Sequence, residues 1–255
     1  NLHKNHIPTY IIAATFRPKQ LFFQPWGKGY RNLLKCFTCL YVQSKESLQL
    51  LQQYGINHVE VAGDTRFDRV QQIANQVQPI PVIEDFVRKN NDKKIIVAGS
   101  TWAEDEMMLA HYLQQNDDVV LVLVPHEINL ERLREIFQTF HGRFVRYTEA
   151  SAANVGMCRI LMIDTLGMLS RIYQYADVAY IGGAFCVGIH NTLEAAVYGV
   201  PVIFGPHYHK FREAKGLIQA GAAKSVHNYD TFAKALNEAL EQSKTMGQCA
   251  KDYVT

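Results

Sequence analysis

The chain has 255 residues, which is long enough to bury one or two hydrophobic cores. Hydrophobic residues make up 48% and charged residues 20%, as in ordinary globular proteins, and no apolar run approaches the roughly 20 residues of a membrane span. Five cysteines without framework spacing favour reduced thiols. The composition therefore argues against a disulfide-stapled domain and against a membrane-spanning helix within this sequence.

The basic residues are concentrated at the start of the chain. The net charge is +2, yet residues 1–45 contain seven lysines and arginines and no acidic residue. This asymmetry predicts a basic face toward an anionic partner. Residues 17–35 also mix Phe22, Phe23 and Trp26 with the basic side chains. This stretch could contact an anionic membrane surface, or it could be a surface helix and loop whose aromatic rings pack inward.

The first third of the chain alternates between strand and helix patterns. Strands are expected at residues 10–16, 36–43 and 59–61, and a helix capped by Ser44 is expected to end at Tyr54. Short links between such elements favour a parallel sheet. We expect residues 1–64 to be the remnant of an N-terminal domain. Residues 65–92 are expected to be a linker that begins with a helix over residues 65–77, and residues 93–255 to be a second domain.

A second alternating series begins at residue 93. Thr101 and Glu104 predict a capping box for a helix that runs through residue 115, and Asp164 predicts the cap of a helix over residues 165–175. The remaining helices are expected at residues 129–140, 191–199, 214–220 and 229–241. Strands are expected at residues 95–98, 119–124, 144–147, 159–163, 178–181, 201–204 and 223–226.

Four of these strands end in polar or glycine residues. The strand ends are Gly99-Ser100-Thr101, Pro125-His126, Asp164 and Gly182-Gly183. Parallel strands finish at one edge of their sheet, and ligands bind at that carboxyl edge. These turns therefore predict one crevice.

The strongest motif is a glycine-rich loop between a strand and a helix. Gly182, Gly183 and Gly188 permit the backbone to approach a phosphate closely, and His190 and Asn191 stand directly before the helix. A loop that delivers N–H groups to a helix N-terminus predicts an anion site. The alternatives are a simple tight turn for the glycines and a buried, hydrogen-bonded core position for the histidine.

The other polar residues near these turns each have two interpretations. Glu194 could accept both hydroxyls of a ribose, or it could reach back to Asn191 as the partner in a capping box. Ser100 and Thr101 could bind a carboxylate or cap the following helix. His126 could meet a base or a phosphate, or it could be a structural turn residue.

The sequence offers no convincing set of metal ligands. His207 and His209 are two residues apart and lack a third ligand, and Cys36 and Cys39 lack a second pair with zinc spacing. A metal-free mechanism is therefore expected.

Four segments together resemble the motifs of 3-deoxy-D-manno-octulosonic acid (Kdo) transferases. Residues 182–211, GGAFCVGIHNTLEAAVYGVPVIFGPHYHKF, resemble the family pattern GGS…GGHNxLEPxxxGxPVxxGP. Residues 61–70, VAGDTRFDRV, resemble the linker TGNxKFD, and residues 99–106, GSTWAEDE, resemble the turn GSTHxGEE. Residues 163–183, IDTLGMLSRIYQYADVAYIGG, resemble DTxGELxxLYxxADxAFxGG. The motifs follow in the family's order across nearly the whole chain.

The resemblance implies an α/β fold of GT-B type with two Rossmann-like domains. Residues 93–255 would be the complete C-terminal, donor-binding domain, and residues 1–64 the tail end of the N-terminal, acceptor-binding one. The implied reaction is an inverting, metal-independent transfer of Kdo from CMP-Kdo to a lipid A precursor in lipopolysaccharide biosynthesis, without a cofactor and without a nucleic-acid partner. The protein would act peripherally at the cytoplasmic face of the bacterial inner membrane.

The resemblance also assigns roles residue by residue. Asn191, Thr192, Leu193 and Glu194 match the CMP-binding HNxLE, and Arg66 matches a linker lysine that would offset charge on the leaving phosphate. The other substrate-binding residues that it implies are Ser100, Thr101, Pro125, His126, Gly167, Met168, Leu169, Gly183, Gly188, His190 and Lys210.

Three departures from the family pattern qualify this assignment. His126 replaces a family arginine and Met168 replaces a family glutamate, so the contacts to phosphate and cytidine differ. The family's general base, a glutamate, would lie upstream of residue 1, so the chain is expected to be N-terminally truncated and inactive alone. Two other functions stay open: a GT-B transferase or epimerase that uses a UDP-sugar, and a module that only binds a nucleotide or lipid.

Overall fold

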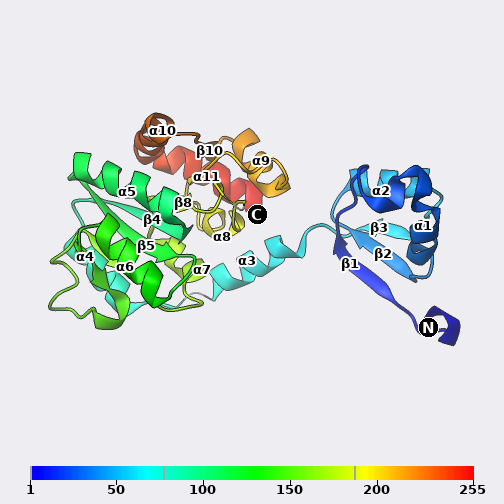
Figure 1. Cartoon of the computed structure of the whole chain (residues 1–255), viewed down its shortest axis with the longest axis horizontal. Coiled ribbons are helices and arrows are strands. Elements are labelled where there is room, and N and C mark those ends of the chain that lie inside the picture. Colours follow the sequence, from blue (N-terminus) through cyan, green and yellow to red (C-terminus); the bar gives the residue numbers. More distant parts are fainter. Residues whose placement is uncertain (1, 77, 187) are drawn as a thin grey trace. The chain divides into compact units, whose positions relative to one another are not determined.

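A computed structural model describes residues 2–76, 78–186 and 188–255. The chain divides into two compact units, Asn1–Arg69 and Val70–Thr255, and each is described by itself (Figure 1). The expected helix end at Val77, and Val187 of the glycine-rich loop, lie outside the described residues. The division falls within helix α3 (Thr65–Asn75), and α4 (Pro81–Lys89) follows it, so two helices occupy most of the expected linker.

In the described part of the first unit, three parallel strands form a sheet in the order β1-β2-β3. The strands are β1 (Tyr10–Ala14), β2 (Cys39–Val42) and β3 (Val59–Val61), and the helices are α1 (Lys28–Leu34) and α2 (Lys45–Gln53). Short 3₁₀ turns lie at His3–Asn5, Leu21–Phe23 and Pro25–Gly27. The Ser44 hydroxyl accepts a hydrogen bond from Ser47 N at 3.3 Å, so the predicted cap of α2 is confirmed.

The basic and aromatic stretch over residues 17–35 divides between core and surface. Phe22 and Phe23 form edge-to-face pairs with Phe16 at 6.0 Å and so belong to the core of the first unit. Arg31 donates to the carbonyl oxygens of Phe22 and Gln24, at 2.7 and 3.2 Å, so its cation holds this loop in place.

Other side chains of the same stretch face water. Trp26 is 70% exposed, Leu33 59% and Tyr30 47%. Lys19, Lys28 and Lys35 are exposed as well. Inward packing therefore describes Phe22 and Phe23, whereas contact of the exposed side chains with a membrane surface stays a prediction.

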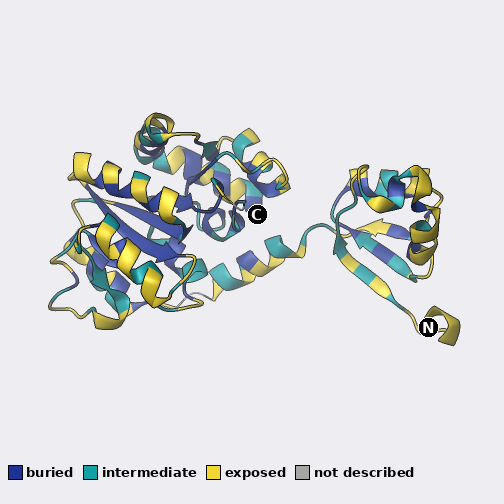
Figure 2. Cartoon of the chain, in the orientation of Figure 1, coloured by how far each residue is buried: buried dark blue, intermediate teal, exposed yellow. Residues whose placement is uncertain are grey.

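Within the described residues of the second unit, seven parallel strands pair in the order β10-β9-β8-β4-β5-β7-β6. Their bounds are β4 (Lys94–Thr101), β5 (Val119–Pro125), β6 (Val145–Arg146), β7 (Ile160–Met162), β8 (Val178–Ile181), β9 (Val202–Phe204) and β10 (Ala223–Ser225). The central strands β5 and β8 are buried along their whole length, and the outer sides of the helices are exposed (Figure 2). The predicted α/β class with parallel sheets is confirmed.

The helices of the second unit lie between these strands or, for the last two, after them. They are α5 (Ala103–Gln115), α6 (Leu130–Thr139), α7 (Leu169–Ile172), α8 (Leu193–Ala196), α9 (Arg212–Gln219), α10 (Tyr229–Glu241) and α11 (Ser243–Val254), with 3₁₀ turns at Tyr147–Glu149 and Tyr173–Tyr175. The helix expected over residues 191–199 is reduced to α8. Helix α11, which was not predicted, packs against α8 and α9.

The predicted cap at Asp164 is wrong. Its carboxylate accepts from Thr148 N at 3.0 Å, from the Thr148 hydroxyl at 2.6 Å and from Arg146 Nε at 2.9 Å. Because these donors on the neighbouring β6 turn occupy both carboxylate oxygens, the helix expected from residue 165 starts only at Leu169.

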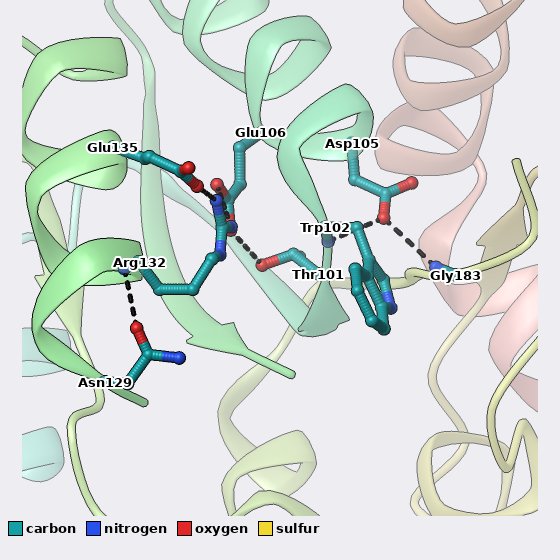
Figure 3. Close-up of polar contacts among 8 residues, drawn as sticks. All are labelled: Thr101, Trp102, Asp105, Glu106, Asn129, Arg132, Glu135 and Gly183. Atoms are coloured by element: carbon teal, nitrogen blue, oxygen red, sulfur yellow. Dashed lines mark hydrogen bonds and ion pairs between the residues drawn. The ribbon is translucent and has the colours of Figure 1, made fainter. Parts of the chain in front are cut away.

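A buried ion pair joins α5 to α6 (Figure 3). The Glu106 carboxylate is fully buried and accepts from Arg132 Nη2 at 2.6 and 2.7 Å and from the Thr101 hydroxyl at 2.9 Å. Arg132 also pairs with Glu135. Burial raises the pKa of Glu106, although the hydrogen bonds and charge of Arg132 oppose that shift.

We expect Arg132→Met to destabilise the second unit by about 3–5 kcal/mol near neutral pH, because it leaves a buried carboxylate without its cation. The Glu106 pKa, already raised by burial, should then rise further. The folded variant would hold a proton that the unfolded chain releases, so its stability should fall as pH rises above the range in which an unfolded glutamate loses its proton. Urea unfolding within and above this range measures the effect. The double variant Arg132→Met, Glu106→Gln is the control, because it has no carboxylate to bury. If it loses as much free energy of unfolding as the single variant at every pH, the prediction is wrong.

Candidate functional site

The turns after four neighbouring strands share the carboxyl edge of the seven-stranded sheet. Strands β8, β4, β5 and β7 are adjacent and parallel, so the prediction that these strand ends share one edge is confirmed. Thr101 and His126 touch directly, because His126 N donates to Thr101 O at 3.0 Å. Asp164 ends its strand at the same edge, but its carboxylate serves the β6 turn.

Strand β4 ends in an irregular, left-handed step at Ser100. Its φ is +54°, a conformation that non-glycine residues seldom adopt, and the register with β5 shifts between Gly99 and Thr101. Thr101 is 1% exposed and its hydroxyl donates to Glu106, so the predicted capping box of Thr101 with Glu104 is wrong. The residue before α5 is Trp102, and the acidic side chain that accepts its N–H is Asp105.

Asp105 connects this turn to the glycine-rich loop. Its Oδ2 accepts from Trp102 N at 2.9 Å and from Gly183 N at 3.0 Å (Figure 3). Its Oδ1 accepts from the Tyr180 hydroxyl at 2.6 Å. The side chain is 1% exposed, and this burial raises the pKa of its carboxyl against the opposing effect of the three hydrogen bonds.

The glycines at the end of β8 serve close packing. A Cβ at Gly182 would lie 2.4 Å from Ser100 O and 2.7 Å from Asp105 Oδ2, so no side chain fits there. Gly183 has φ +88°, which favours glycine. The N–H groups of Gly182, Gly183 and Gly188 donate to Gly99 O, Asp105 Oδ2 and Gly183 O respectively. These N–H groups therefore already have acceptors within the protein. This contradicts the prediction that they donate to a ligand phosphate.

Three aromatic rings from the three turns form a stack. The ring of His126 lies 4.8 Å from that of Trp102, with 25° between the planes, and 4.5 Å from that of His190. The pKa of His190 is lowered, first by burial and then by the nearby His126. The stack places an indole and two imidazoles at the predicted ligand edge.

Several buried polar side-chain atoms of the second unit lack a hydrogen-bond partner among the described residues. They are Trp102 Nε1, His190 Nε2, Thr192 Oγ1 and the Tyr198 hydroxyl. An unsatisfied buried polar group costs about 1–3 kcal/mol, so such atoms are rare and point to a missing partner. Thr192 is fully buried, and it directly precedes α8.

Asn191 and Glu194 interact, but not as the expected capping box. Asn191 Nδ2 donates to Glu194 Oε1 at 3.0 Å, and Asn191 Oδ1 accepts from Leu193 N at 3.2 Å. The residue that caps α8 is Thr192, and it makes no side-chain capping bond. The carboxylate of Glu194 is therefore oriented by the amide side chain of its neighbour.

Residues 167–169 form an apolar wall at the edge. Met168 is 9% exposed, and its sulfur accepts from the Thr165 hydroxyl at 2.9 Å. The side chains of Leu169 and Tyr173 fill the space that a Cβ at Gly99 would need. Gly167 is exposed. No carboxylate stands where the family pattern has its glutamate.

The segment that contains Lys210 lies against the glycine-rich loop. His207 N donates to Ala184 O at 2.9 Å, and the ring of Phe211 lies 3.4 Å from the place of a Cβ at Gly188. Lys210 itself is exposed, and Pro125 is the buried last residue of β5.

Arg66 belongs to the first unit, where it forms an ion pair. Its Nη2 lies 2.6 Å from Asp64 Oδ2, and its Nε lies 3.0 and 3.1 Å from the two carboxylate oxygens. The guanidinium is thus fixed by an acidic residue of the same linker motif.

The sequence interpretation missed the residues that fix the turns. These are Trp102, Asp105, Glu106, Arg132 and Tyr180. Acidic residues in the first turn of a helix are common because they complement its dipole, so only their burial distinguishes Asp105 and Glu106. Among the described residues, no three His, Cys, Asp or Glu side chains cluster in a way that could hold a metal ion.

Comparisons with known proteins agree with the sequence motifs. The family model described as 3-deoxy-D-manno-octulosonic-acid transferase (kdotransferase) matches residues 1–69. The 3-deoxy-D-manno-octulosonic acid transferase of Rickettsia bellii is 26% identical over 245 residues, which are 92% of this chain and 57% of that protein. The chain spans about half the length of the curated relatives that it matches.

Solved structures show the same fold. The C-terminal CMP-Kdo binding domain of WaaA from Acinetobacter baumannii matches with a TM-score of 0.57 at 20% identity, over 74% of this chain and 97% of that one. The UDP-GlcNAc 2-epimerase from Neisseria meningitidis matches with a TM-score of 0.63 at 13% identity, over 98% and 65%. The fold is therefore of GT-B type. The ordered motifs, the family model over residues 1–69 and the relatives at 26% and 28% identity agree that the chain is similar to Kdo transferases.

Proposed function

We propose that the second unit binds CMP-Kdo at the carboxyl edge of its seven-stranded sheet, for transfer of Kdo to a lipid A precursor. The observation that carries this proposal is the set of unsatisfied buried atoms in the segment that matches HNxLE. His190 Nε2 and Thr192 Oγ1 lack partners in the described structure, and both can donate to a phosphate oxygen. Beside them, the Glu194 carboxylate suits a ribose diol.

The other residues have supporting roles in this proposal. Ser100 would hold the Kdo carboxylate at the end of β4. Thr101, whose hydroxyl donates to Glu106, would support this turn, with the buried Pro125 at the end of the adjacent strand. His126, Met168 and Leu169, with Gly167, would contact the cytidine. Gly183 and Gly188 would let the loop backbone lie close to the donor. Lys210 would add a positive charge near it.

The proposed reaction is an inverting displacement. A general base removes the proton from the acceptor hydroxyl, whose oxygen attacks the anomeric carbon of Kdo. The bond to the CMP phosphate oxygen breaks, and CMP leaves with that electron pair. Arg66 would offset the charge that develops on the phosphate. Neither a metal nor a cofactor takes part in this scheme.

The general base is not assigned to any residue of this sequence. The chain spans about half the length of the curated relatives that it matches. We propose that the chain alone binds the donor without transferring it.

A UDP-sugar enzyme is the second candidate. Two positions keep this candidate open. His126 lacks the guanidinium, and Met168 lacks the carboxylate, that the Kdo transferase pattern has at these places. The structural match to a UDP-GlcNAc 2-epimerase along nearly the whole chain is also compatible with a uridine nucleotide.

Isothermal titration of the chain with CMP and with UDP should separate the two candidates. We expect CMP to bind more tightly than UDP. We also expect Glu194→Ala to weaken CMP binding by about tenfold or more, since a carboxylate that accepts two hydroxyls makes charge-assisted hydrogen bonds. Glu241→Ala, at the exposed end of α10, is the matched control. If UDP binds more tightly than CMP, the CMP-Kdo proposal is wrong and the UDP-sugar candidate takes its place.

We further propose that the first unit contacts the cytoplasmic face of the inner membrane as a peripheral protein. Its exposed Trp26, Tyr30 and Leu33 lie among lysines, a combination that suits an anionic lipid surface. The helices of the described chain are all too short or too polar to cross a bilayer. The phosphates of a lipid A precursor would meet the same positive charge.

Reversing the charge of Lys19, Lys28 and Lys35 to glutamate should weaken binding to phosphatidylglycerol vesicles by about 100-fold, since each basic residue near such a surface contributes about 1 kcal/mol. Arg31 is left unchanged because it holds the loop together. Reversal of the exposed Lys215, Lys244 and Lys251 changes the net charge equally and is the control. Vesicle co-sedimentation measures both variants. If both triple variants lose vesicle binding to the same extent, the effect comes from net charge, and the proposed membrane-binding face is wrong.

A further inference from the structure

We propose that Asp105 is a positioning residue of the donor site, which holds the Ser100–Trp102 turn and the glycine-rich loop at the spacing that a bound nucleotide requires. The inference rests on the proposed function, since it assigns this role within the same site. It concerns a residue that touches no reacting atom and acts through the two loops that it joins.

The geometry of Asp105 supports this role. One oxygen, Oδ2, accepts N–H groups from two loops that are far apart in sequence: Trp102 N at 2.9 Å and Gly183 N at 3.0 Å. The other oxygen is held by the Tyr180 hydroxyl on β8 at 2.6 Å, so the carboxylate cannot rotate without losing a bond. A shared acceptor keeps both N–H groups close to one point (Figure 3).

The two loops are also linked through the stacked rings. The ring of Trp102 stacks on His126, and the ring of His126 lies against His190. His190 in turn packs on Gly183, because its Cδ2 would lie 3.0 Å from a Cβ there. Asp105, Trp102, His126, His190 and Gly183 thus form a closed circuit of contacts. The unsatisfied atoms Trp102 Nε1 and His190 Nε2 belong to this circuit, so its spacing sets where a ligand can bind.

No other residue type would make the same connection easily. Gly182 lies so close to Ser100 and Asp105 that the loops meet backbone to backbone, and only an acceptor fits between their N–H groups. Asparagine has the same shape as aspartate, but it is neutral and has only one acceptor oxygen, so it would lose the charge-assisted bonds to the two N–H groups. The ionisable groups that act on the carboxylate are Glu104 and Glu106 on α5 and Tyr180 on β8, and Cys186 lies on the loop opposite.

A ligand-free measurement tests the connection itself. In ¹⁵N-labelled protein, the amide signals of Trp102 and Gly183 should move together as pH is lowered, with one shared midpoint. Burial raises the Asp105 pKa, so this midpoint should lie above that of an exposed aspartate. Protonation weakens the shared acceptor, and both amide protons should therefore shift upfield below the midpoint. Separate midpoints, or no movement of Gly183, would overturn the inference without any nucleotide.

A binding measurement tests the role. Asp105→Asn should weaken CMP binding by about tenfold or more, because both loops lose a charge-assisted anchor. Glu104→Gln, on the exposed side of the same helical turn, removes a neighbouring carboxylate and should bind CMP like the wild type. Amide spectra of each variant establish that it is folded, and if Asp105→Asn does not fold, the wild-type titration still decides the inference.

The outcomes distinguish the inference from the proposed function. Equal CMP affinity of folded Asp105→Asn and wild type would overturn the positioning role alone. Failure of the wild type to bind CMP would overturn the proposed function and the inference with it. We expect Asp105→Asn to bind CMP more weakly and Glu104→Gln to bind it like the wild type. We also expect the amide signals of Trp102 and Gly183 to share one pH midpoint.

Discussion

Asp105 and Glu106 are adjacent in the chain and almost fully buried, and their carboxylates point to opposite sides of the ligand edge. Burying a carboxylate is costly unless donors replace the water that it loses. Here each has its replacement: two backbone N–H groups and a tyrosine for Asp105, and an arginine and a threonine for Glu106. Because both lie in the first turn of α5, the helix dipole favours their negative charge as well. The turns after β4, β5 and β8 depend on this pair for their positions.

This arrangement changes the view of how the glycine-rich loop functions. The loop's glycines donate their N–H groups to acceptors within the protein and make room for backbone contact, so in the proposed site the ligand would be recognised by side chains. The imidazole of His190 and the hydroxyl of Thr192 are the groups whose hydrogen-bonding capacity remains unused in the described structure.

Much of the fold could be predicted from the sequence because its signals are local. Alternating strand and helix patterns with short links indicated parallel sheets, and the strand ends indicated the shared edge. Helix bounds failed where a long-range contact competed with a local one. Aspartate is a common helix cap, but the oxygens of Asp164 accept hydrogen bonds from Arg146 on the neighbouring strand β6 and from Thr148 just after it. The capping box of Thr101 with Glu104 failed for the same reason, since the hydroxyl found a buried acceptor in Glu106.

The close contact at Gly182 has a consequence for how this edge can change over time. A methyl group there would collide with the backbone of Ser100 and with the carboxylate of Asp105, and a longer side chain at position 105 would collide with the glycine. Neither position can accept a larger residue unless the two strands separate. Substitutions at these two sites are therefore coupled by simple steric exclusion.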